Sequence, residues 1–412
     1  MSWPVGTTNL ERAIDTIERH HLDALVAVSP ENARHLSGVP NFIASRWRTP
    51  GLASAVVAKN GNRAVVTGDQ GVSVPSAIAH LTYPLWIDNV DIRSVEGSSV
   101  YERISAVRGN ATLDRTAQFN LEEVVETVAA AIQAVTPNAS RIGIELASTL
   151  SAFLNLLTDR LPGTEFIDAN HLFDDLRTIK EPWELDLLRD AGLLTEAGIA
   201  GAIAAIQPGM DGADISIAYQ RAVLDAVAIH PNKHLFNDAE GLVAVGSSGI
   251  GSIVAPGVTI KFDQQVDLGG YHSDVGRTVA FEPTLQQLEI YEALFEGLDA
   301  GRVAIRIGDP LSAIYDAGAA AVRRFIPSYS RGHLGHGVGL TTSFEEAPFI
   351  TAREHRPIVP GMALSIEMPL YLGGAGSFQL ESMVLIHEDR VEFVDTLPWH
   401  PDLSYWQTGR LP

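Results

Sequence analysis

Residues 261–281 read KFDQQVDLGGYHSDVGRTVAF, and this stretch decides how the second half of the chain folds. Apolar residues flank Asp263, a Gly-Gly-Tyr turn begins at Gly269, and Asp274 follows the turn. The pattern predicts two adjacent strands joined by a hairpin, with both aspartates facing one pocket. Side chains alternate along a strand, so the odd spacing between the aspartates requires a turn or bulge that resets the face. Asp267 is a competing candidate, although its place beside the glycines also fits an ordinary turn residue.

Two further carboxylates stand inside strongly apolar, strand-like runs: Glu367 in SIEMPLYL and Glu381 in FQLESMVLI. Burying a carboxylate is costly unless it is paired or bound to a metal. His336, set between glycines in RGHLGHGVGL, adds an imidazole. Taken singly, each residue also fits an exposed charge or a loop histidine, but the set predicts a metal site. The predicted ligands are Asp263, Asp274, His336, Glu367 and Glu381.

This donor set predicts the chemistry of the site. Four carboxylates and one imidazole favour two divalent ions, with Mn first and Zn, Co or Fe as alternatives, over a tetrahedral structural zinc. Two such ions about 3.5–4 Å apart would activate a water as a nucleophile at neutral pH. Glu367 is the expected proton shuttle. The chain has no cysteine, which excludes disulfides, thiolate ligands and cysteine nucleophiles.

Bulk composition narrows the class of protein. A length of 412 residues predicts two domains. The net charge of −21 and the lack of a Lys/Arg-rich run argue against nucleic acid as a partner. The N-terminus lacks a signal-peptide pattern, and no apolar stretch approaches the length of a membrane span. We therefore expect a cytoplasmic protein that is not bound to a membrane.

The domain boundary is predicted from a change in sequence texture. Helix and strand signals alternate over residues 1–172, with Asn60-Gly61 as a strong hairpin signal, and this predicts an α/β domain. A long helix with Pro182 near its start then opens a second domain, residues 173–412.

A weak internal repeat runs through the second domain. Residues 184–228 and 284–325 each read as two helices joined by a Gly-containing turn, and each is followed by a glycine-rich β region. The pattern fits either a duplicated αβ unit or two ordinary helical hairpins. A duplicated unit would place a ligand pocket at the interface between its halves.

With these residues identified, the chain resembles the pita-bread metallopeptidases: aminopeptidase P, prolidase, methionine aminopeptidase and the metal-free creatinase. The resemblance covers residues 175–390 well and rests on Asp263, Asp274 before Arg277-Thr278, His336 in GHGVGL, Glu367 and Glu381. It implies a creatinase-type α/β N-terminal domain followed by an α+β pita-bread catalytic domain. It also implies hydrolysis of an amide or peptide bond in a short, Xaa-Pro-like substrate, and a homodimer.

The chain departs from the family pattern where substrate is held. The histidine expected upstream of Asp263 is missing from VGSSGIGSIVAPG, and Ser343 stands where a second histidine is expected after His336. Gln265 replaces a usual glycine, and QLES replaces the common R-x-E-D. In the family these histidines look to hold the substrate carbonyl, and losing such donors costs roughly 10²–10³-fold in rate.

Four residues are candidates for the rebuilt substrate site. His333 either replaces a lost donor as a catalytic residue or is a locally bonded loop histidine, and Ser343 lies where the substrate is expected. Arg46 and Trp47, in ASRWRTPG, either bind substrate across a dimer or belong to an exposed loop.

Three functions follow from this reading. The leading hypothesis is a dinuclear-metal hydrolase of the Xaa-Pro peptidase kind, acting on a small-molecule or short peptide substrate. The alternative is a divergent member that acts on a non-peptide metabolite as a hydrolase or lyase. A non-catalytic binding protein is the third, but such relatives usually lose ligands and this chain keeps all of them.

Overall fold

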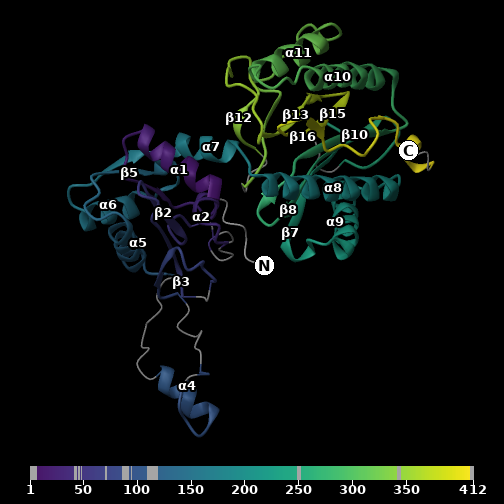
Figure 1. The fold of residues 1–412 in the computed structure, drawn as a ribbon. Coiled ribbons are helices and arrows are strands. Elements are labelled where there is room, and N and C mark those ends of the chain that lie inside the picture. Colours follow the sequence, from purple (N-terminus) through teal and green to yellow (C-terminus); the bar gives the residue numbers. More distant parts are fainter. Residues whose placement is uncertain are drawn as a thin grey trace. The chain divides into compact units, whose positions relative to one another are not determined.

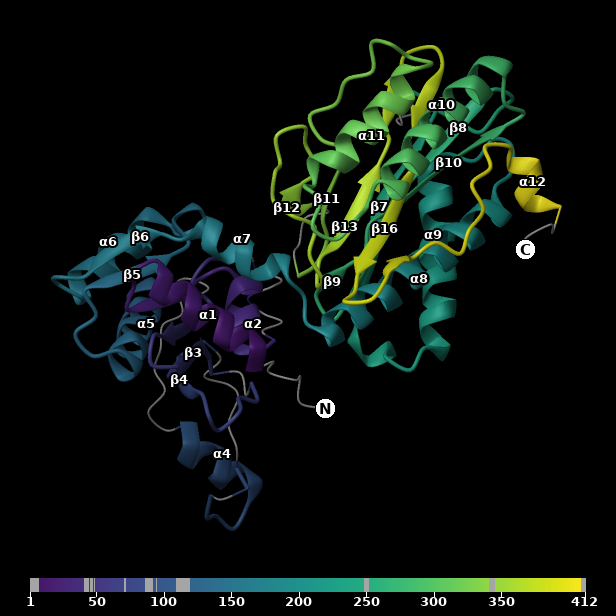
Figure 2. The same ribbon diagram turned by 45° about the horizontal axis from the view of Figure 1, so that its top comes forward.

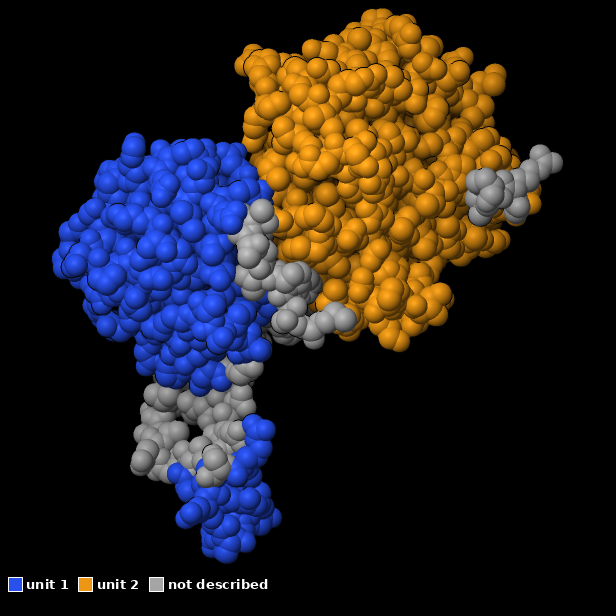
Figure 3. Space-filling view, viewed as in Figure 1, with its two compact units in different colours: residues 1–176 blue, residues 177–412 orange. Residues whose placement is uncertain are grey.

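The computed structural model describes residues 7–40, 44, 47, 49–69, 72–85, 92–93, 95–108, 119–247, 252–340 and 345–408. The chain forms two compact units, Met1–Leu176 and Arg177–Pro412 (Figure 3). They divide inside one helix, α7 (Asn170–Thr178). A continuous helix carries no composition signal at which such a boundary could be predicted.

The N-terminal unit is an α/β layer structure around a six-stranded sheet with the order β4-β3-β2-β1-β5-β6. Its strands are β1 (Ala24–Ala27), β2 (Ser54–Ala58), β3 (Arg63–Gly68), β4 (Ala79–Tyr83), β5 (Arg141–Ile144) and β6 (Glu165–Asp168). Besides α7, its helices are α1 (Thr7–Arg19), α2 (Pro30–Ser37), α4 (Val100–Arg108), α5 (Leu121–Val135), α6 (Ser151–Arg160) and the short 3₁₀ turn Leu146–Ser148.

Local signals in the sequence explain these elements. Ser29 caps α2 by accepting a hydrogen bond from the Asn32 amide, and Gly38 ends the helix with φ 68°, a left-handed conformation that suits glycine. The predicted hairpin at Asn60-Gly61 is confirmed: β2 and β3 pair antiparallel, and Gly61 has φ 82°.

The C-terminal unit is built on a nine-stranded sheet whose main path is β12-β11-β13-β16-β10-β8-β7. The strands of this unit are β7 (Phe236–Val245), β8 (Val258–Leu268), β9 (Tyr271–His272), β10 (Val275–Phe281), β11 (Gly335–Gly337), β12 (Glu346–Phe349), β13 (Ala363–Glu367), β14 (Leu370–Leu372), β15 (Gly376–Phe378), β16 (Glu381–Ile386) and β17 (Val391–Phe393). Its helices are α8 (Pro182–Ala205), α9 (Gly212–Ile229), α10 (Leu285–Val303), α11 (Ser312–Arg323) and α12 (Leu403–Gln407), with a 3₁₀ turn at Lys233–Leu235.

The helices of this unit form two pairs. Helices α8 and α9 pack against β7 and β8, whereas α10 and α11 share a core with β13 and β16 (Figures 1 and 2). The order of a helix pair followed by strands therefore occurs twice along the chain, as the repeated pattern predicts. Gly198 lets α9 approach α8 closely, because a Cβ there would lie 2.4 Å from the Val223 side chain.

The sequence predicts one long helix with Pro182 near its start at the opening of the second domain, but the structure has two helices there. Helix α7 ends at Thr178, and α8 begins at Pro182 with a capping box between Glu181 and Glu184. The break follows from chemistry, since proline has no amide hydrogen and disfavours helical geometry in the residue before it.

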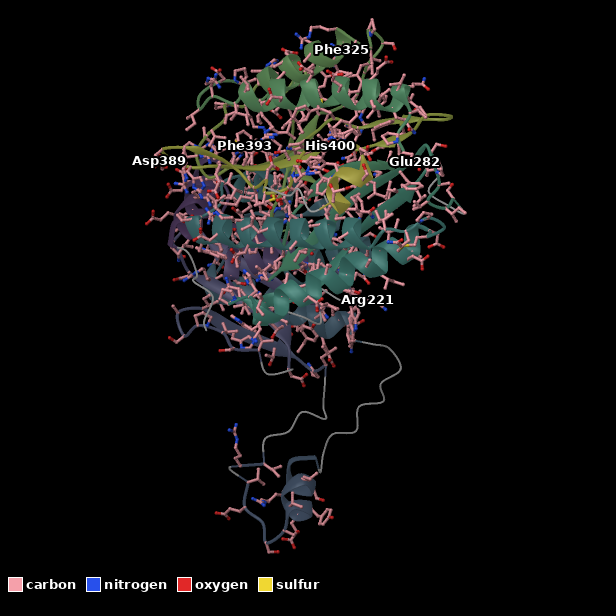
Figure 4. The ribbon with its side chains drawn as sticks, turned by 90° about the vertical axis from the view of Figure 1, so that its right-hand side faces the viewer. Arg221, Glu282, Phe325, Asp389, Phe393 and His400 are labelled. Carbon is pink, nitrogen blue, oxygen red and sulfur yellow. The ribbon has the colours of Figure 1, made fainter. Side chains whose placement is uncertain are left out.

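The C-terminal segment returns across the sheet. β17 pairs with β16, and the Ala280 amide of β10 donates to the carbonyl of Pro401. Figure 4 marks Phe393 and His400 on this segment. Among the residues that the structure describes, none of the helices combines the length and apolar character that a membrane span requires.

Candidate metal centre

The strand register gathers three predicted ligands into one row across the sheet. Glu367 on β13 is paired with Glu381 on β16, Glu381 with Gly276 on β10, and Gly276 with Asp263 on β8. Asp274 lies two residues before Gly276, so both point to the same face. The hairpin formed by β8, β9 and β10 therefore brings the two aspartates onto one side, as the sequence predicts.

Gly276 keeps the middle of this row open. A Cβ at this position would lie 2.5 Å from the Gln379 side chain and 2.8 Å from Cβ of Glu381. It would also lie 3.0 Å from Oε2 of Glu381. Any other residue would therefore fill the space between the carboxylates, where a cation would be held.

Two groups of candidate ligand atoms lie among the described residues: one partly buried group of His333, Glu345 and Glu367, and one fully buried group of Asp274, His336 and Glu381. The buried group holds three of the predicted ligands. Each offers an atom within 4.8 Å of the other two, and all three residues are buried. Nε2 of His336 lies 3.5 Å from Oδ2 of Asp274 and 3.7 Å from Oε1 of Glu381. Nδ1 of His336 lies 3.0 Å from the Gly337 carbonyl, which fixes the ring and leaves Nε2 for a metal. Oδ1 of Asp274 is buried with no hydrogen-bond donor among the described residues.

Electrostatics also favours a bound cation. Burial raises the pKa of Asp274 well above its usual value, and the neighbouring carboxylates of Glu381 and Asp263 raise it further. Burial and the nearby Glu367 and Asp263 do the same to the pKa of Glu381. Divalent cations would offset this mutual repulsion and keep the carboxylates ionised. The donors, the orphaned oxygen and the open row therefore fit divalent ions.

Glu367 is held by two polar neighbours. Nε2 of Gln379 donates to Oε2 of Glu367 (2.8 Å) and to Oε2 of Glu381 (3.0 Å), so it bridges two predicted ligands. Nδ1 of His333 lies 3.2 Å from Oε1 of Glu367. Burial raises the pKa of Glu367, but the contacts with His333 and Gln379 outweigh it and lower the pKa overall. The same contact with Glu367 raises the pKa of His333.

Asp263 has a different kind of neighbour. Nζ of Lys261 lies 2.9 Å from Oδ2 of Asp263, and the two side chains leave the same face of β8. Burial lowers the pKa of Lys261, but the carboxylate of Asp263 more than compensates and the pKa is raised.

A network of buried residues supports the row from behind. Arg277 donates to the carbonyls of Gly276 and Glu381 (both 2.9 Å) and to Oε1 of Glu196 (2.6 Å). Thr278 exchanges hydrogen bonds with the backbone of Gln379, at 2.8 and 3.1 Å. The Arg-Thr pair after Asp274 thus fixes the start of β16, where Glu381 stands. All these contacts of Arg277 are with the protein's own backbone and Glu196, so its role here is structural.

A cavity of about 480 Å³ opens beside Asp263. Its lining residues come from β7, β8, β14, β15 and the turn after β7: Leu242, Ala244, Ser247, Lys261, Asp263, Tyr371 and Ser377. It is large enough for a small substrate next to the carboxylates.

The other predicted site residues have different outcomes. Ser343 and Arg46 lie outside the described residues, so their predicted roles stay predictions. Trp47 is half-buried and packs against the core of the N-terminal unit, and its role in binding also stays a prediction. Asp267 accepts hydrogen bonds from the Gly270 amide (2.5 Å) and the Asn237 side chain (3.1 Å), which agrees with the turn interpretation.

Sequence reasoning missed Lys261, Ser365 and Gln379 as functional neighbours. Ser365 donates to Oε1 of Glu381 (2.8 Å). Each of the three stands two positions before a predicted ligand, and residues two apart on a strand share a face. That spacing is the signal that could have identified them.

Comparison with known proteins identifies the family. Residues 186–388 match metallopeptidase family M24, and residues 9–179 match the creatinase/prolidase N-terminal domain. The probable dipeptidase PepE of Mycobacterium tuberculosis is 30% identical over 248 residues, 56% of this chain and 62% of that protein. The chain thus spans less than two thirds of the length of this relative.

Solved structures share the fold over nearly the whole chain. The Xaa-Pro dipeptidase from Bacillus anthracis superimposes with a TM-score of 0.73 at 18% identity, covering 96% of this chain and 99% of the other. The dipeptidase PepE from Mycobacterium ulcerans gives 0.68 at 21% identity, covering 98% and 99%. The family models therefore place residues 186–388 in metallopeptidase family M24 and residues 9–179 among creatinase/prolidase N-terminal domains, and the solved structures share the fold, with the pita-bread C-terminal domain that the sequence predicts.

Proposed function

We propose that the protein is a divalent-metal-dependent hydrolase that cleaves the C–N bond of an amide or peptide in a small substrate. Short peptides of the Xaa-Pro kind are the first candidates, because relatives such as the enzyme of Pyrococcus furiosus are named Xaa-Pro dipeptidases. The observation that carries the proposal is the row of carboxylates around Gly276, with a buried, unpartnered Oδ1 on Asp274.

The full ligand set would hold two ions. Asp263, Asp274, His336, Glu367 and Glu381 supply mainly oxygen donors with one imidazole, which suits Mn first and Zn, Co or Fe as alternatives. Bound ions of this type supply Lewis acidity and lower the pKa of water.

The chain's own residues would move and position the proton. The Glu367 carboxylate accepts a proton from the attacking water and returns it to the leaving nitrogen. Gln379 donates a hydrogen bond to Oε2 of Glu367 (2.8 Å) and so orients the carboxylate, and Nδ1 of His333 lies 3.2 Å from Oε1. His333 lies beside the carboxylate of Glu367, which supports its predicted catalytic role.

A matched pair of variants tests the proposal. Purified protein is reconstituted with Mn²⁺ and assayed against Xaa-Pro dipeptides and tripeptides. Glu367→Gln should lose about 10²-fold or more in kcat, because it removes the proton shuttle. Glu354→Gln, in which the altered residue pairs with Arg356 (2.7 Å) outside the site, should keep wild-type activity. Equal activity of Glu367→Gln and wild type, or a protein that binds no divalent ion, would contradict the proposal.

A second candidate is the hydrolysis or elimination of a non-peptide metabolite. The cavity beside Asp263 favours it, since its described lining offers a lysine, a tyrosine and two serines and no histidine. Screening the metal-loaded protein against a metabolite extract would identify the substrate by its depletion. Robust turnover of several Xaa-Pro peptides would exclude this candidate.

Cytoplasmic location and a homodimer remain sequence-based proposals. Light scattering of the purified protein tests the dimer directly, because a single copy has a mass of 44.3 kDa.

A further inference from the structure

The ion pair between Lys261 and Asp263 places a cation at one predicted ligand. The Lys261 side chain is only 4% exposed, and Asp263 is its ion-pair partner among the described residues. Nζ also lies 5.3 Å from the centre of the Tyr371 ring. A buried ammonium requires a counter-charge, so Asp263 neutralises Lys261 as much as Lys261 neutralises Asp263.

The two halves of the ligand set are therefore unequal. Asp274, His336 and Glu381 already bring ligand atoms within 4.8 Å of one another, and no lysine of the described residues forms an ion pair with them. Within the described part of the chain, Asp263 belongs to no such group. An ion can enter the first position without meeting an ammonium, whereas an ion at Asp263 meets the ammonium that already holds Oδ2 of this carboxylate.

We propose that Lys261 is a built-in competitor for the second divalent ion. The first ion occupies Asp274, His336 and Glu381, and the second binds only when Asp263 exchanges the ammonium for a metal. This inference rests on the two-ion site of the proposed function and adds an order of loading. An ammonium 2.9 Å from Oδ2 of Asp263 repels a cation bound to that carboxylate, so most of the cost falls on the second ion.

The cavity beside Asp263 gives the displaced ammonium a place to go. Lys261 lines this cavity together with Ser247 and Ser377, whose hydroxyls can accept hydrogen bonds from an ammonium. Loading of the second ion would thus turn Lys261 toward the space where substrate is expected. The lysine would then present a positive charge to the substrate only when both ions are bound.

Metal stoichiometry tests the inference without a substrate. Apo protein prepared with a chelator is titrated with Mn²⁺ by calorimetry, and retained metal is counted by mass spectrometry after desalting. Wild type should retain one ion per chain and bind a second at least tenfold more weakly. Lys261→Met keeps the aliphatic stem and removes the charge. Its affinity for the second Mn²⁺ ion should be at least tenfold higher than that of wild type, which corresponds to about 1.4 kcal/mol.

A matched lysine provides the control. Lys59 pairs with Asp23 at 2.7 Å in the N-terminal unit, so Lys59→Met removes the same charge and a more exposed lysine–aspartate pair away from the ligands. This variant should bind Mn²⁺ as wild type does. Lys261→Arg keeps a positive charge, so its affinity for the second Mn²⁺ ion should stay as low as that of wild type.

Each outcome bears on a separate claim. Two equally tight ions in wild type, or an unchanged second affinity in Lys261→Met, would refute the competition while leaving the proposed hydrolase intact. No Mn²⁺ bound by wild type would refute the proposed function itself. If Lys261→Met fails to fold in a thermal melt, Lys261→Gln replaces it, and the wild-type titration still decides between equal and unequal positions.

Discussion

Replacing Arg277 with methionine removes the centre of the buried network behind the site. The guanidinium is 1% exposed, as is its partner Glu196, and it lies 3.6 Å from the centre of the Trp399 ring. Its hydrogen bond to the Glu381 carbonyl ties this network to the start of β16. Methionine fills much of the same volume but supplies neither the charge nor the donors.

The expected loss follows from the carboxylate left behind. Breaking a buried ion pair by removing one partner costs about 3–5 kcal/mol. For a unit of this size each kcal/mol corresponds to about 2–4 °C, so the melting temperature of the C-terminal unit should fall by about 6–20 °C. Burial raises the pKa of Glu196 and Arg277 opposes this rise, so the variant should protonate Glu196 more readily. The loss should therefore be smaller in acid, where the carboxyl is neutral.

Calorimetric melts of matched variants measure the effect. Arg324 forms a 3.0 Å pair with Glu296, but these side chains are 63% and 50% exposed, so Arg324→Met should cost at most about 1 kcal/mol. The double variant Arg277→Met/Glu196→Gln should recover part of the stability, because the buried charge of Glu196 is gone and Asp395, the other carboxylate beside Arg277, keeps its pair with Arg302. The reasoning fails if Arg277→Met loses no more stability than Arg324→Met, or if adding Glu196→Gln makes it worse.

Three further changes have defined outcomes. Ser365→Ala removes the 2.8 Å hydrogen bond to Glu381, so the affinity for the first Mn²⁺ ion, measured by chelator competition, should fall 10–100-fold. An unchanged affinity would exclude a role of Ser365 in orienting Glu381. Adding Mn²⁺ at about 100 times its dissociation constant should stabilise the fold by about 2.7 kcal/mol. The melting temperature should rise, and EDTA should reverse the rise. A melting temperature that Mn²⁺ leaves unchanged would show that the protein has no such site. Arg189 lowers the pKa of Glu392 from 4.5 to about 2, so the stability this pair adds is complete above pH 4.5 and is lost as the pH falls toward 2. Glu392→Gln should flatten that acid slope in pH-dependent melts, by up to about 1 kcal/mol after solvent screening, whereas an unchanged slope would exclude the pair as its source.

Much of the fold was predictable because its signals are local. The cap at Ser29, the left-handed glycine at Gly38 and the hairpin at Gly61 each depend on a few neighbouring residues. The break between α7 and α8 was harder to predict, because the apolar pattern runs through it and only Pro182 marks the new start. The paired halves of the C-terminal unit were visible as a repeated order of elements rather than as repeated residues.

The candidate ligands were predictable for another reason. A carboxylate in an apolar strand violates the hydrophobic pattern, so Glu367 and Glu381 stand out in the sequence. Their register could not be read in the same way, because the pairing of Gly276 with Glu381 joins strands distant in the chain. The role of Gly276 as an open space therefore emerges only from the folded sheet.

The residues that set the properties of the site follow from combining the two kinds of information. Once a ligand is assigned to a strand, the residue two positions earlier must share its face, so Lys261 and Gln379 become neighbours of the site. Gln379 is neutral and bridges two carboxylates, whereas Lys261 brings a full charge to Asp263. The ligand pattern alone cannot distinguish two equal metal positions from two unequal ones. The identity of these neighbours does distinguish them, and it is there that this chain's chemistry should differ from a site defined by its ligands alone.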